Sequence, residues 1–187
     1  KIMRRPDGSR FFYVVVLDEN AIMHKRLETA KKAKQDSLTG LLNHQAIVME
    51  INALIQDHCE GVCMMLDIDD FKRINDNYGH IEGDRVIVTL SKALLAEFPN
   101  ALIGRFGGDE FLLYFVGAKE EGHAEELGKK VVKIMNKIKI NGSIPLCGSI
   151  GISLSRGGFF SVDEAVRKAD EAMYSAKKSG KNKFAIK

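Results

Sequence analysis

The stretch ALIGRFGGDEFLLYFV at residues 101–116 contains two apolar runs separated by a pair of glycines. The runs, 101–106 and 110–116, are rich in aromatic and branched side chains, which favour β-strands. The glycine pair at 107–108 is typical of a tight turn, because glycine adopts the backbone angles that such turns need. The sequence therefore predicts a β-hairpin whose second strand begins with acidic residues.

Helical and strand patterns alternate on both sides of this hairpin. Before it we expect a helix, a strand and a helix, at residues 36–59, 62–66 and 84–97. After it we expect a helix, a strand, a helix and a strand, at residues 120–137, 144–154, 161–180 and 183–187. The order α-β-α-β-β-α-β-α-β predicts an α+β fold with a mixed, mainly antiparallel central sheet flanked by helices.

Two of these helices have start signals in the sequence. Asp36, Ser37 and Thr39 offer N-cap side chains for the first helix. Ser161 and Glu164 have the spacing of a capping box, in which each side chain pairs with a backbone N–H of the other residue. We therefore expect the two helices to begin at these positions.

The N-terminal part of the chain differs in composition from the rest. Residues 10–17, RFFYVVVL, follow a Pro-Asp-Gly turn signal and predict a strand. Residues 20–35 are rich in Lys, Ala, Glu and Leu and predict an exposed helix with a thin apolar stripe. We therefore expect two parts. Residues 1–35 would be the end of an upstream domain with a linker helix, and residues 36–187 the main domain.

The composition is that of a globular protein with a hydrophobic core: 45% of the 187 residues are hydrophobic and 28% are charged. The net charge of +3, from 28 basic and 25 acidic residues, gives no indication of nucleic-acid or membrane binding. Cys59 and Cys63 have a CxxxC spacing without a second His/Cys cluster, which is a weak metal signal, so we favour structural roles for the cysteines.

No apolar stretch has the length of a membrane span, and no signal peptide is visible. The chain opens on Lys1 rather than Met, so we expect it to be a fragment. The expected location is the cytoplasm, with no membrane contact from this fragment, whereas the parent protein could carry a membrane anchor upstream.

Acidic residues follow two of the predicted strands. Asp67 ends the apolar run 62–66, and Asp109 and Glu110 follow the glycine pair. A carboxylate at the end of a buried strand must meet solvent, a cation or a donor, because burying it unpaired is costly. Paired glycines let a ligand approach the backbone, and carboxylates beside them are ligands that Mg²⁺ prefers. A simple strand-ending Asp and a plain hairpin with a polar tip remain the alternatives.

The segment FKRINDNYGHIEGD, residues 71–84, carries several groups suited to a nucleotide. Lys72 supplies a point charge for phosphate. Asn75 and Asp84 have the donors and acceptors to read a base edge, since Asp can accept from the N–H groups of guanine. The alternative is a solvated loop in which Asp84 is the N-cap of the next helix and His80 is structural.

Five separated segments together resemble the GGDEF family of diguanylate cyclases. They are DSLTGLLNH (36–44), LDIDDFKRINDNYGHIEGD (66–84), RFGGDEF (105–111), SIGIS (149–153) and ADEAMYSAKKSGKN (169–182). The resemblance covers about residues 36–187, and the motif that names the family is present letter for letter at 107–111. It implies a fold like the palm of nucleotide cyclases and polymerases, which agrees with the element order above.

The resemblance implies roles for individual residues. Asp67, the Ile68 carbonyl and Asp109 would coordinate Mg²⁺, or Mn²⁺ in its place. Asp109 would also be the catalytic residue and proton acceptor, supported by Glu110. The substrate-binding residues would be the turn glycines, the guanine-binding side chains with His80 beside them, and three lysines that neutralise the triphosphate: Gly107, Gly108, Asn75, Asp84, His80, Lys72, Lys177 and Lys181. Without the resemblance, Lys177 and Lys181 would be interpreted as a solvated helix end.

The implied reaction condenses two GTP molecules into cyclic di-GMP and two pyrophosphates. One domain of this family binds one GTP, so the active species would be a homodimer with its site between the two copies. A non-catalytic GTP-binding domain that regulates a neighbour is the main alternative. A polymerase-like or mononucleotide cyclase palm is a second alternative, against which Asn75 and Asp84 count, because they suit guanine.

The sequence departs from the family pattern at two places. His44 stands where the family commonly has Arg after the Asn of its first motif, which puts the role of that cation in question. The family's inhibitory product site uses an RxxD motif just before the signature, and here that stretch is Phe98-Pro99-Asn100-Ala101. We therefore predict no product inhibition through that site. The N-terminal 35 residues resemble the terminal strand of a PAS-like sensor domain followed by a signalling helix.

Overall fold

The computed structural model describes residues 2–4, 10–12, 23, 29–57, 60–118, 120–155 and 161–187. The chain divides into two compact units, Lys1–Ala33 and Lys34–Lys187. In the first unit, β1 (Ile2–Arg4) pairs antiparallel with β2 (Arg10–Phe12). Residues 23 and 29–33 are helical, with exposed side chains. The rest of the predicted strand at 10–17 and much of the predicted helix at 20–35 lie outside the described residues.

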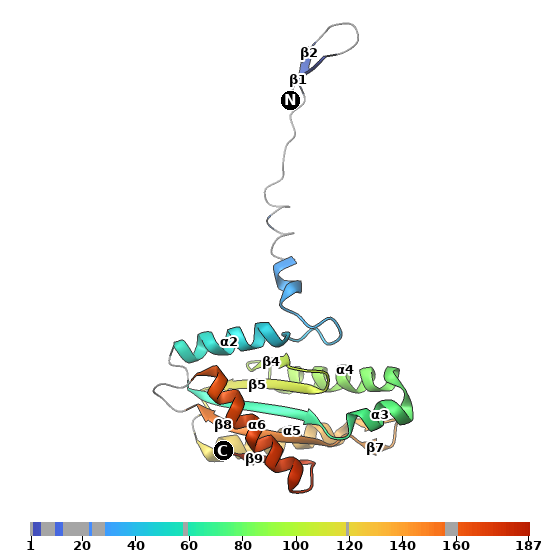
Figure 1. The fold of residues 1–187 in the computed structure, drawn as a ribbon, viewed down its shortest axis with the longest axis vertical. Helices are drawn as coiled ribbons and strands as arrows, with labels where there is room; N and C mark the ends of the chain where they lie inside the picture. Colours follow the sequence, from blue (N-terminus) through green and yellow to red (C-terminus); the bar gives the residue numbers. More distant parts are fainter. Residues whose placement is uncertain are drawn as a thin grey trace. The chain divides into compact units, whose positions relative to one another are not determined.

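The second unit is built on a five-stranded sheet in the order β4-β5-β3-β8-β9 (Figure 1). The strands are β3 (Gly61–Ile68), β4 (Leu102–Arg105), β5 (Glu110–Val116), β8 (Gly148–Ser155) and β9 (Lys183–Ile186). Neighbouring strands run antiparallel except β8 and β9, which are parallel. The predicted mixed, mainly antiparallel α+β fold is therefore confirmed.

Helices cover both faces of this sheet. They are α2 (His44–Gln56), α3 (Phe71–Tyr78), α4 (His80–Glu97), α5 (Glu121–Lys137) and α6 (Val162–Lys178). Successive residues of a strand point to opposite faces, so the central strand β3 feeds two cores. Val62, Met64 and Leu66 pack with the residues of α4 and α5, whereas Cys63 and Met65 pack with those of α2 and α6. A strand buried on both faces explains the unbroken apolar run at 62–66.

The first helix begins later than the sequence predicts. The predicted N-cap residue Asp36 instead closes a turn, in which its carboxylate accepts hydrogen bonds from the Thr39 backbone N–H and hydroxyl. The helix starts at His44, where the side chain of Asn43 accepts from the Ala46 N–H. The prediction of a helix from Asp36 is wrong because a side chain with N-cap chemistry stabilises an isolated turn equally well.

The segment 71–84 is helical rather than a loop. It forms α3 and the first turns of α4, which meet at Gly79 with a φ of +82°. Asp84 is therefore not the N-cap of a helix, because it lies inside α4, which begins at His80. Polar side chains around two glycines suggest a loop, but only one glycine interrupts the helical backbone.

The predicted strand at 144–154 is divided in two. β7 (Ile144–Pro145) pairs with β6 (Lys139–Ile140) in a short hairpin, and β8 begins three residues later. At the last helix the predicted N-terminus is confirmed, since the Ser161 side chain accepts from the Glu164 N–H. None of the helices within the described residues is long and apolar enough to cross a membrane.

Candidate active site

The register between β3 and β5 brings the predicted acidic residues together. Asp67 at the end of β3 lies opposite Glu110 at the start of β5. The Ile68 N–H donates to the carbonyl of Asp109 at 3.2 Å. Asp67 alternates with Leu66 and Ile68 along the strand, so its side chain lies on the same face as Met65, the face covered by α2 and α6. Two segments far apart in the sequence thus bring three carboxylates together. We call this site the acidic corner; its residues are Asp67, Asp109 and Glu110.

The two glycines of the hairpin turn have different surroundings. The N–H groups of Phe106 and Gly107 donate to the Glu110 carbonyl at 2.8 and 3.2 Å. A Cβ at Gly107 would lie 2.6 Å from Glu110 Oε2, whereas a Cβ at Gly108 would meet nothing within 4 Å. A side chain at 107 would displace the Glu110 carboxylate, whereas the backbone at 108 is open to a ligand.

The side chain of Arg105 stabilises the glycine turn through hydrogen bonds to its backbone. Arg105 donates from Nε and Nη2 to the Gly108 carbonyl at 3.1 and 2.6 Å. Its guanidinium also forms an ion pair with Asp36 at 3.3 Å. Burial raises the pKa of Asp36, but hydrogen bonds from Thr39 and the charge of Arg105 outweigh burial and hold that pKa below its ordinary value. Sequence reasoning missed this contact because it joins positions 69 residues apart.

The acidic corner is electrostatically crowded. Burial raises the pKa of Asp67, which is 9% exposed, and the charges of Asp109 and Asp69 add to the rise. Burial and the charges of Asp67 and Asp109 likewise raise the pKa of Glu110. Lys177 of α6 opposes both shifts, and its Nζ lies 2.8 Å from Asp67 Oδ2. Raised carboxylate pKa values mean that the corner favours additional positive charge.

The predicted metal-binding residues fit Mg²⁺ only in part by themselves. Within the described residues, no three His, Cys, Asp or Glu side chains form a metal-binding group. The predicted set has two carboxylates, Asp67 and Asp109, and the Ile68 carbonyl. Mg²⁺ is usually held by one or two carboxylates and completed by water and substrate phosphates, so this donor set suits a metal that arrives with a nucleotide. The ammonium of Lys177 beside Asp67 shows that this carboxylate accepts a cation.

The loop after α6 is tied to the same corner by a residue that sequence reasoning missed. Asp69 is 8% exposed, and its carboxylate accepts from the Ser149 hydroxyl at 2.7 Å and from the Asn182 N–H at 2.9 Å. Next to it, Lys181 has a φ of +60° and its Nζ lies 2.7 Å from Asp70 Oδ1. The acidic run Asp67–Asp70 is visible in the sequence, but only the tertiary contacts show which carboxylate anchors the loop.

The predicted guanine-binding residues lie on the two helices that meet at Gly79. Asn75 is on α3, half-buried, and its Oδ1 is buried without a hydrogen-bond partner. The side chains of Lys72, His80 and Asp84 are exposed. Among the described residues, no hydrogen bond or ion pair connects these three side chains to the acidic corner, so the structure does not join the two halves of the predicted site directly.

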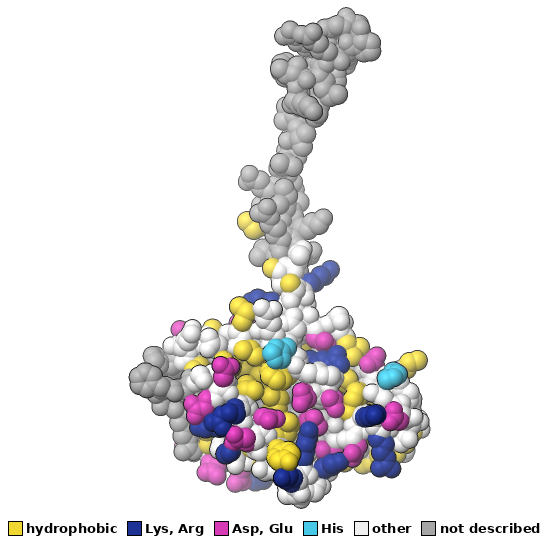
Figure 2. All heavy atoms as spheres, viewed as in Figure 1, with side chains coloured by type: hydrophobic (Ala, Val, Ile, Leu, Met, Phe, Trp, Pro, Cys, Tyr) yellow, Lys and Arg dark blue, Asp and Glu magenta, His cyan; other side chains and the backbone are white. Residues whose placement is uncertain are grey.

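His44 lies beside the acidic corner rather than in it. Its ring centroid is 4.3 Å from that of Phe106, next to the glycine turn. His44, Glu110 and Asp170 line one cavity of about 420 Å³ between α2 and α6. On the face that α6 crosses, acidic and basic side chains lie side by side with apolar side chains between them (Figure 2).

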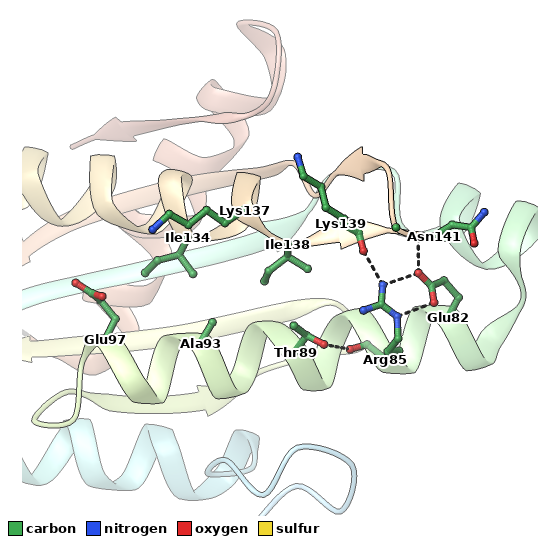
Figure 3. A pocket seen from close by; sticks show the side chains of 11 residues that line it. Glu82, Arg85, Thr89, Ala93, Glu97, Ile134, Lys137, Ile138, Lys139 and Asn141 are labelled. Carbon is green, nitrogen blue, oxygen red and sulfur yellow. Dashed lines mark hydrogen bonds and ion pairs between the residues drawn. The ribbon is translucent and has the colours of Figure 1, made fainter.

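A cavity of about 870 Å³ lies elsewhere, between α4 and α5 (Figure 3). Glu82 and Arg85 form an ion pair at its edge, and they also bind the hairpin β6–β7 through the Lys139 carbonyl and the Asn141 N–H. The Arg85 and Asn141 donors hold the pKa of Glu82 down at about 2. None of the predicted site residues lines this cavity.

The structure is that of an α+β domain with an acidic corner on its central sheet, and comparison with known proteins identifies its family. The sequence model of the family described as "Diguanylate cyclase, GGDEF domain" matches residues 33–183. The chain therefore belongs to the GGDEF family, whose members include diguanylate cyclases of cyclic di-GMP signalling.

Three similar proteins illustrate the range of this family. Diguanylate cyclase DgcM of Escherichia coli K12 is 32% identical over 186 residues, which cover 94% of this chain and 44% of DgcM. Cyclic di-GMP phosphodiesterase PdeR of the same organism is 32% identical over 162 residues, covering 82% of this chain and 24% of PdeR. The crystal structure of diguanylate cyclase SiaD with its activator SiaC, from Pseudomonas aeruginosa, has a TM-score of 0.76 and 32% identity, covering 91% of this chain and 68% of that chain.

The chain thus spans less than half the length of either of the two relatives compared by sequence. One is named for making cyclic di-GMP and the other for degrading it. Family membership therefore assigns the domain to cyclic di-GMP signalling without deciding which activity the whole protein has.

Proposed function

We propose that this domain is a diguanylate cyclase that condenses two GTP molecules into cyclic di-GMP and two pyrophosphates. The observation that carries the proposal is the crowding of Asp67, Asp109 and Glu110 at one corner, where burial and mutual repulsion raise the pKa of Asp67 and of Glu110. Lys177 pairs with Asp67 but does not offset the charges of the other carboxylates, and such an excess of negative oxygen ligands is what a site for a metal and a triphosphate needs.

The residues of the acidic corner would have two roles, metal binding and proton acceptance. Asp67, the Ile68 carbonyl and Asp109 would hold Mg²⁺, or Mn²⁺ in its place. When bound, the metal would neutralise charge on the phosphates and lower the pKa of the attacking 3′-hydroxyl. Asp109 is the proposed acceptor of that proton, supported by Glu110, the next residue in the chain. The open backbone at Gly108 leaves room for the phosphates to approach.

Lysines on two sides would neutralise the triphosphate. Lys177 and Lys181 already lie against the carboxylates of Asp67 and Asp70. When metal and nucleotide occupy the corner, the ammonium groups would move from carboxylate to phosphate oxygens, which needs only rotation about side-chain bonds. Lys72, exposed at the start of α3, would add a third positive charge.

Guanine would bind at α3 and α4, with Asn75 and Asp84 on its hydrogen-bonding edge and His80 beside it. The unpartnered Oδ1 of Asn75 supports this assignment, because a buried acceptor without a partner is costly and is therefore not expected of a residue with a purely structural role. The exposed carboxylate of Asp84 would accept from the guanine N1–H and N2–H groups, which adenine lacks in this arrangement.

A domain that resembles this family would hold one GTP, so both bonds of the product require two domains that face each other. We therefore propose a homodimer as the active species, in which each copy presents its GTP to the other. The unit Lys1–Ala33 would be the end of an upstream, PAS-like sensor domain with a linker helix that brings two copies together. Because residues 98–101 lack the RxxD motif, we expect no product inhibition through that stretch.

A non-catalytic GTP-binding regulatory domain is the second candidate. The match to PdeR, which is named a phosphodiesterase, shows that a similar segment occurs in a protein named for the opposite reaction. Here the carboxylates of the acidic corner are all present, which favours catalysis.

Incubation with GTP and Mg²⁺ tests the proposal, with Asp109→Ala as the inactive control. The expected result is cyclic di-GMP and pyrophosphate from the wild-type chain, with a rate that rises faster than linearly with protein concentration, and no product from the variant. GTP binding without product at high protein concentration would support the regulatory function instead.

A further inference from the structure

Gly83 occupies a position in α4 where the helix leaves no room for a side chain. A Cβ at Gly83 would overlap Oδ1 of Asn75, and would lie 3.1 Å from Asn75 Cγ and 3.2 Å from the ring of Phe71. Asn75 and Phe71 both belong to α3. The two helices therefore approach each other through the bare backbone of Gly83, and the Asn75 carboxamide fills the space where a Cβ would be.

Helix stability alone does not explain this glycine. Gly83 is buried in the second turn of an 18-residue helix, and no left-handed backbone angle is present there. Glycine in a helix interior is less favourable than alanine, because it loses more conformational freedom on folding. The reason for glycine must therefore lie in the group that occupies the space where a side chain would be.

The space beside Gly83 is occupied by the polar carboxamide of Asn75, which packing alone would not place there. The Asn75 Oδ1 that faces Gly83 is buried and has no hydrogen-bond partner. The Cα–H of glycine is a weak donor to such an oxygen, and it offsets only part of the cost of burial. Contact with the α4 backbone therefore sets the position of the Asn75 Oδ1, since this oxygen has no hydrogen-bond partner.

We propose that Gly83 is a positioning residue for the nucleotide: it holds the carboxamide of Asn75 in the place from which it meets the guanine base. This inference rests on the proposed function, since it assumes that Asn75 contacts GTP. Gly83 precedes Asp84 in α4. One turn of this helix would therefore carry the side chain of Asp84 and also leave the space that positions the side chain of Asn75.

The test is a set of alanine variants of the whole 187-residue chain, assayed for GTP and ATP affinity in Mg²⁺ and for kcat and KM. Gly83→Ala should raise the Kd and the KM for GTP about tenfold or more, with a smaller change in kcat, and should reduce the preference for GTP over ATP. Asn75→Ala should give a similar loss, because it removes the same carboxamide.

The double variant Asn75→Ala/Gly83→Ala distinguishes positioning from general damage. Once Asn75→Ala has removed the carboxamide, the new Cβ has no polar group to displace. Adding Gly83→Ala to Asn75→Ala should therefore change the GTP Kd by less than about twofold. Additive losses would show that Gly83 acts independently of Asn75, and would overturn the inference.

Two further glycines serve as controls for folding. Gly122 lies in α5 with nothing within 4 Å of its Cβ position, so Gly122→Ala should leave GTP affinity unchanged and should not lower Tm. A Cβ at Gly128, also in α5, would lie 2.7 Å from the ring of Phe184, so Gly128→Ala should lower Tm while keeping the GTP-over-ATP preference.

The outcomes separate this inference from the proposed function. A wild-type chain that neither binds GTP nor makes cyclic di-GMP contradicts the proposed function. A wild-type chain that binds GTP, with a folded Gly83→Ala variant of equal affinity and equal GTP-over-ATP preference, contradicts the role of Gly83 alone. If Gly83→Ala is unfolded, the decision falls to the double variant against Asn75→Ala, since the clash with the carboxamide is absent in both.

Discussion

The acidic corner and the cavity between α4 and α5 contain the same kinds of side chain in opposite electrostatic states. In the corner, burial and like charges raise the pKa values of Asp67 and Glu110. At the cavity, hydrogen bonds from Arg85 and the Asn141 N–H lower the pKa of Glu82 to about 2. Glu82 accepts hydrogen bonds from Arg85 and from the Asn141 N–H, whereas in the corner the ion pair of Lys177 with Asp67 does not offset the burial and like charges that raise both pKa values.

The difference indicates what each region contributes. A carboxylate with a lowered pKa stabilises the folded state, because the folded protein prefers its charged form. A carboxylate with a raised pKa costs stability at neutral pH, which a protein tolerates where a ligand later supplies the missing charge. The sign of the pKa shift, rather than the volume of the cavity, therefore distinguishes the candidate active site from a structural contact.

The largest expected effect is that of Asp67→Asn. Loss of the charge removes a proposed metal ligand, so cyclic di-GMP synthesis should fall by about 10²–10³-fold or more. Since folding raises the pKa of Asp67, its charged form costs free energy above the raised pKa, and this cost disappears as the pH falls towards the ordinary value of 3.8.

Thermal unfolding checks the same variant. At neutral pH, Tm of Asp67→Asn should equal or exceed that of the wild type, and the difference should vanish at low pH. A large drop in Tm at neutral pH would mean that the ion pair with Lys177 outweighs burial, and that the corner is a structural contact after all.

Lys177→Ala should have the next largest effect. It removes the cation that lies 2.8 Å from Asp67, so triphosphate binding should weaken, with a rise in the KM for GTP of about tenfold. Because Lys177 opposes the rise in the pKa of the buried Asp67, its loss should also lower the free energy of unfolding at neutral pH. Steady-state kinetics over a range of Mg²⁺ concentrations measure the first effect, and Lys178→Ala, one residue later on α6, is the matched control.

Asp69→Asn should act on both stability and activity. The variant keeps the size of the side chain but replaces one acceptor oxygen with an NH₂ donor. The Asn182 N–H then loses its charged acceptor, and the Ser149 hydroxyl has to accept instead of donate. The expected cost is about 1–3 kcal/mol in the free energy of unfolding. Activity should fall severalfold because Lys181 is no longer held over the corner. Denaturant titration and GTP kinetics give the two values, and an unchanged KM would show that the loop does not need this anchor.

The smallest effect is expected at the other region, for Glu82→Gln. The lowered pKa of Glu82 means that its contribution to stability is present above the ordinary value of 4.5 and is lost as the pH falls towards about 2. The variant should lose at most about 1 kcal/mol at neutral pH, because the ion pair with Arg85 is partly exposed, and nothing near pH 2. Cyclic di-GMP synthesis should stay within about twofold of the wild type. A loss of activity as large as that of Asp67→Asn would remove the distinction between the two regions.

Sequence reasoning succeeded where a local pattern has one structural solution. The hairpin around residues 107–108 and the helix capped by Ser161 formed at the predicted positions. It failed where the same residue types stabilise two structures: Asp36 closes a turn instead of capping a helix, and the polar segment 71–84 is helical. The boundaries of such segments depend on what packs against them.

The order of apolar runs, glycines and acidic motifs by itself determined the fold class, the family and the identity of the candidate site residues. Tertiary structure alone decided how those residues are held. It paired Asp67 with Lys177, made Asp69 the anchor of the loop at Asn182, and placed Asn75 against the bare backbone of Gly83. The physical reason is that burial and Coulomb interactions depend on distances between residues far apart in the chain, which a one-dimensional pattern does not contain.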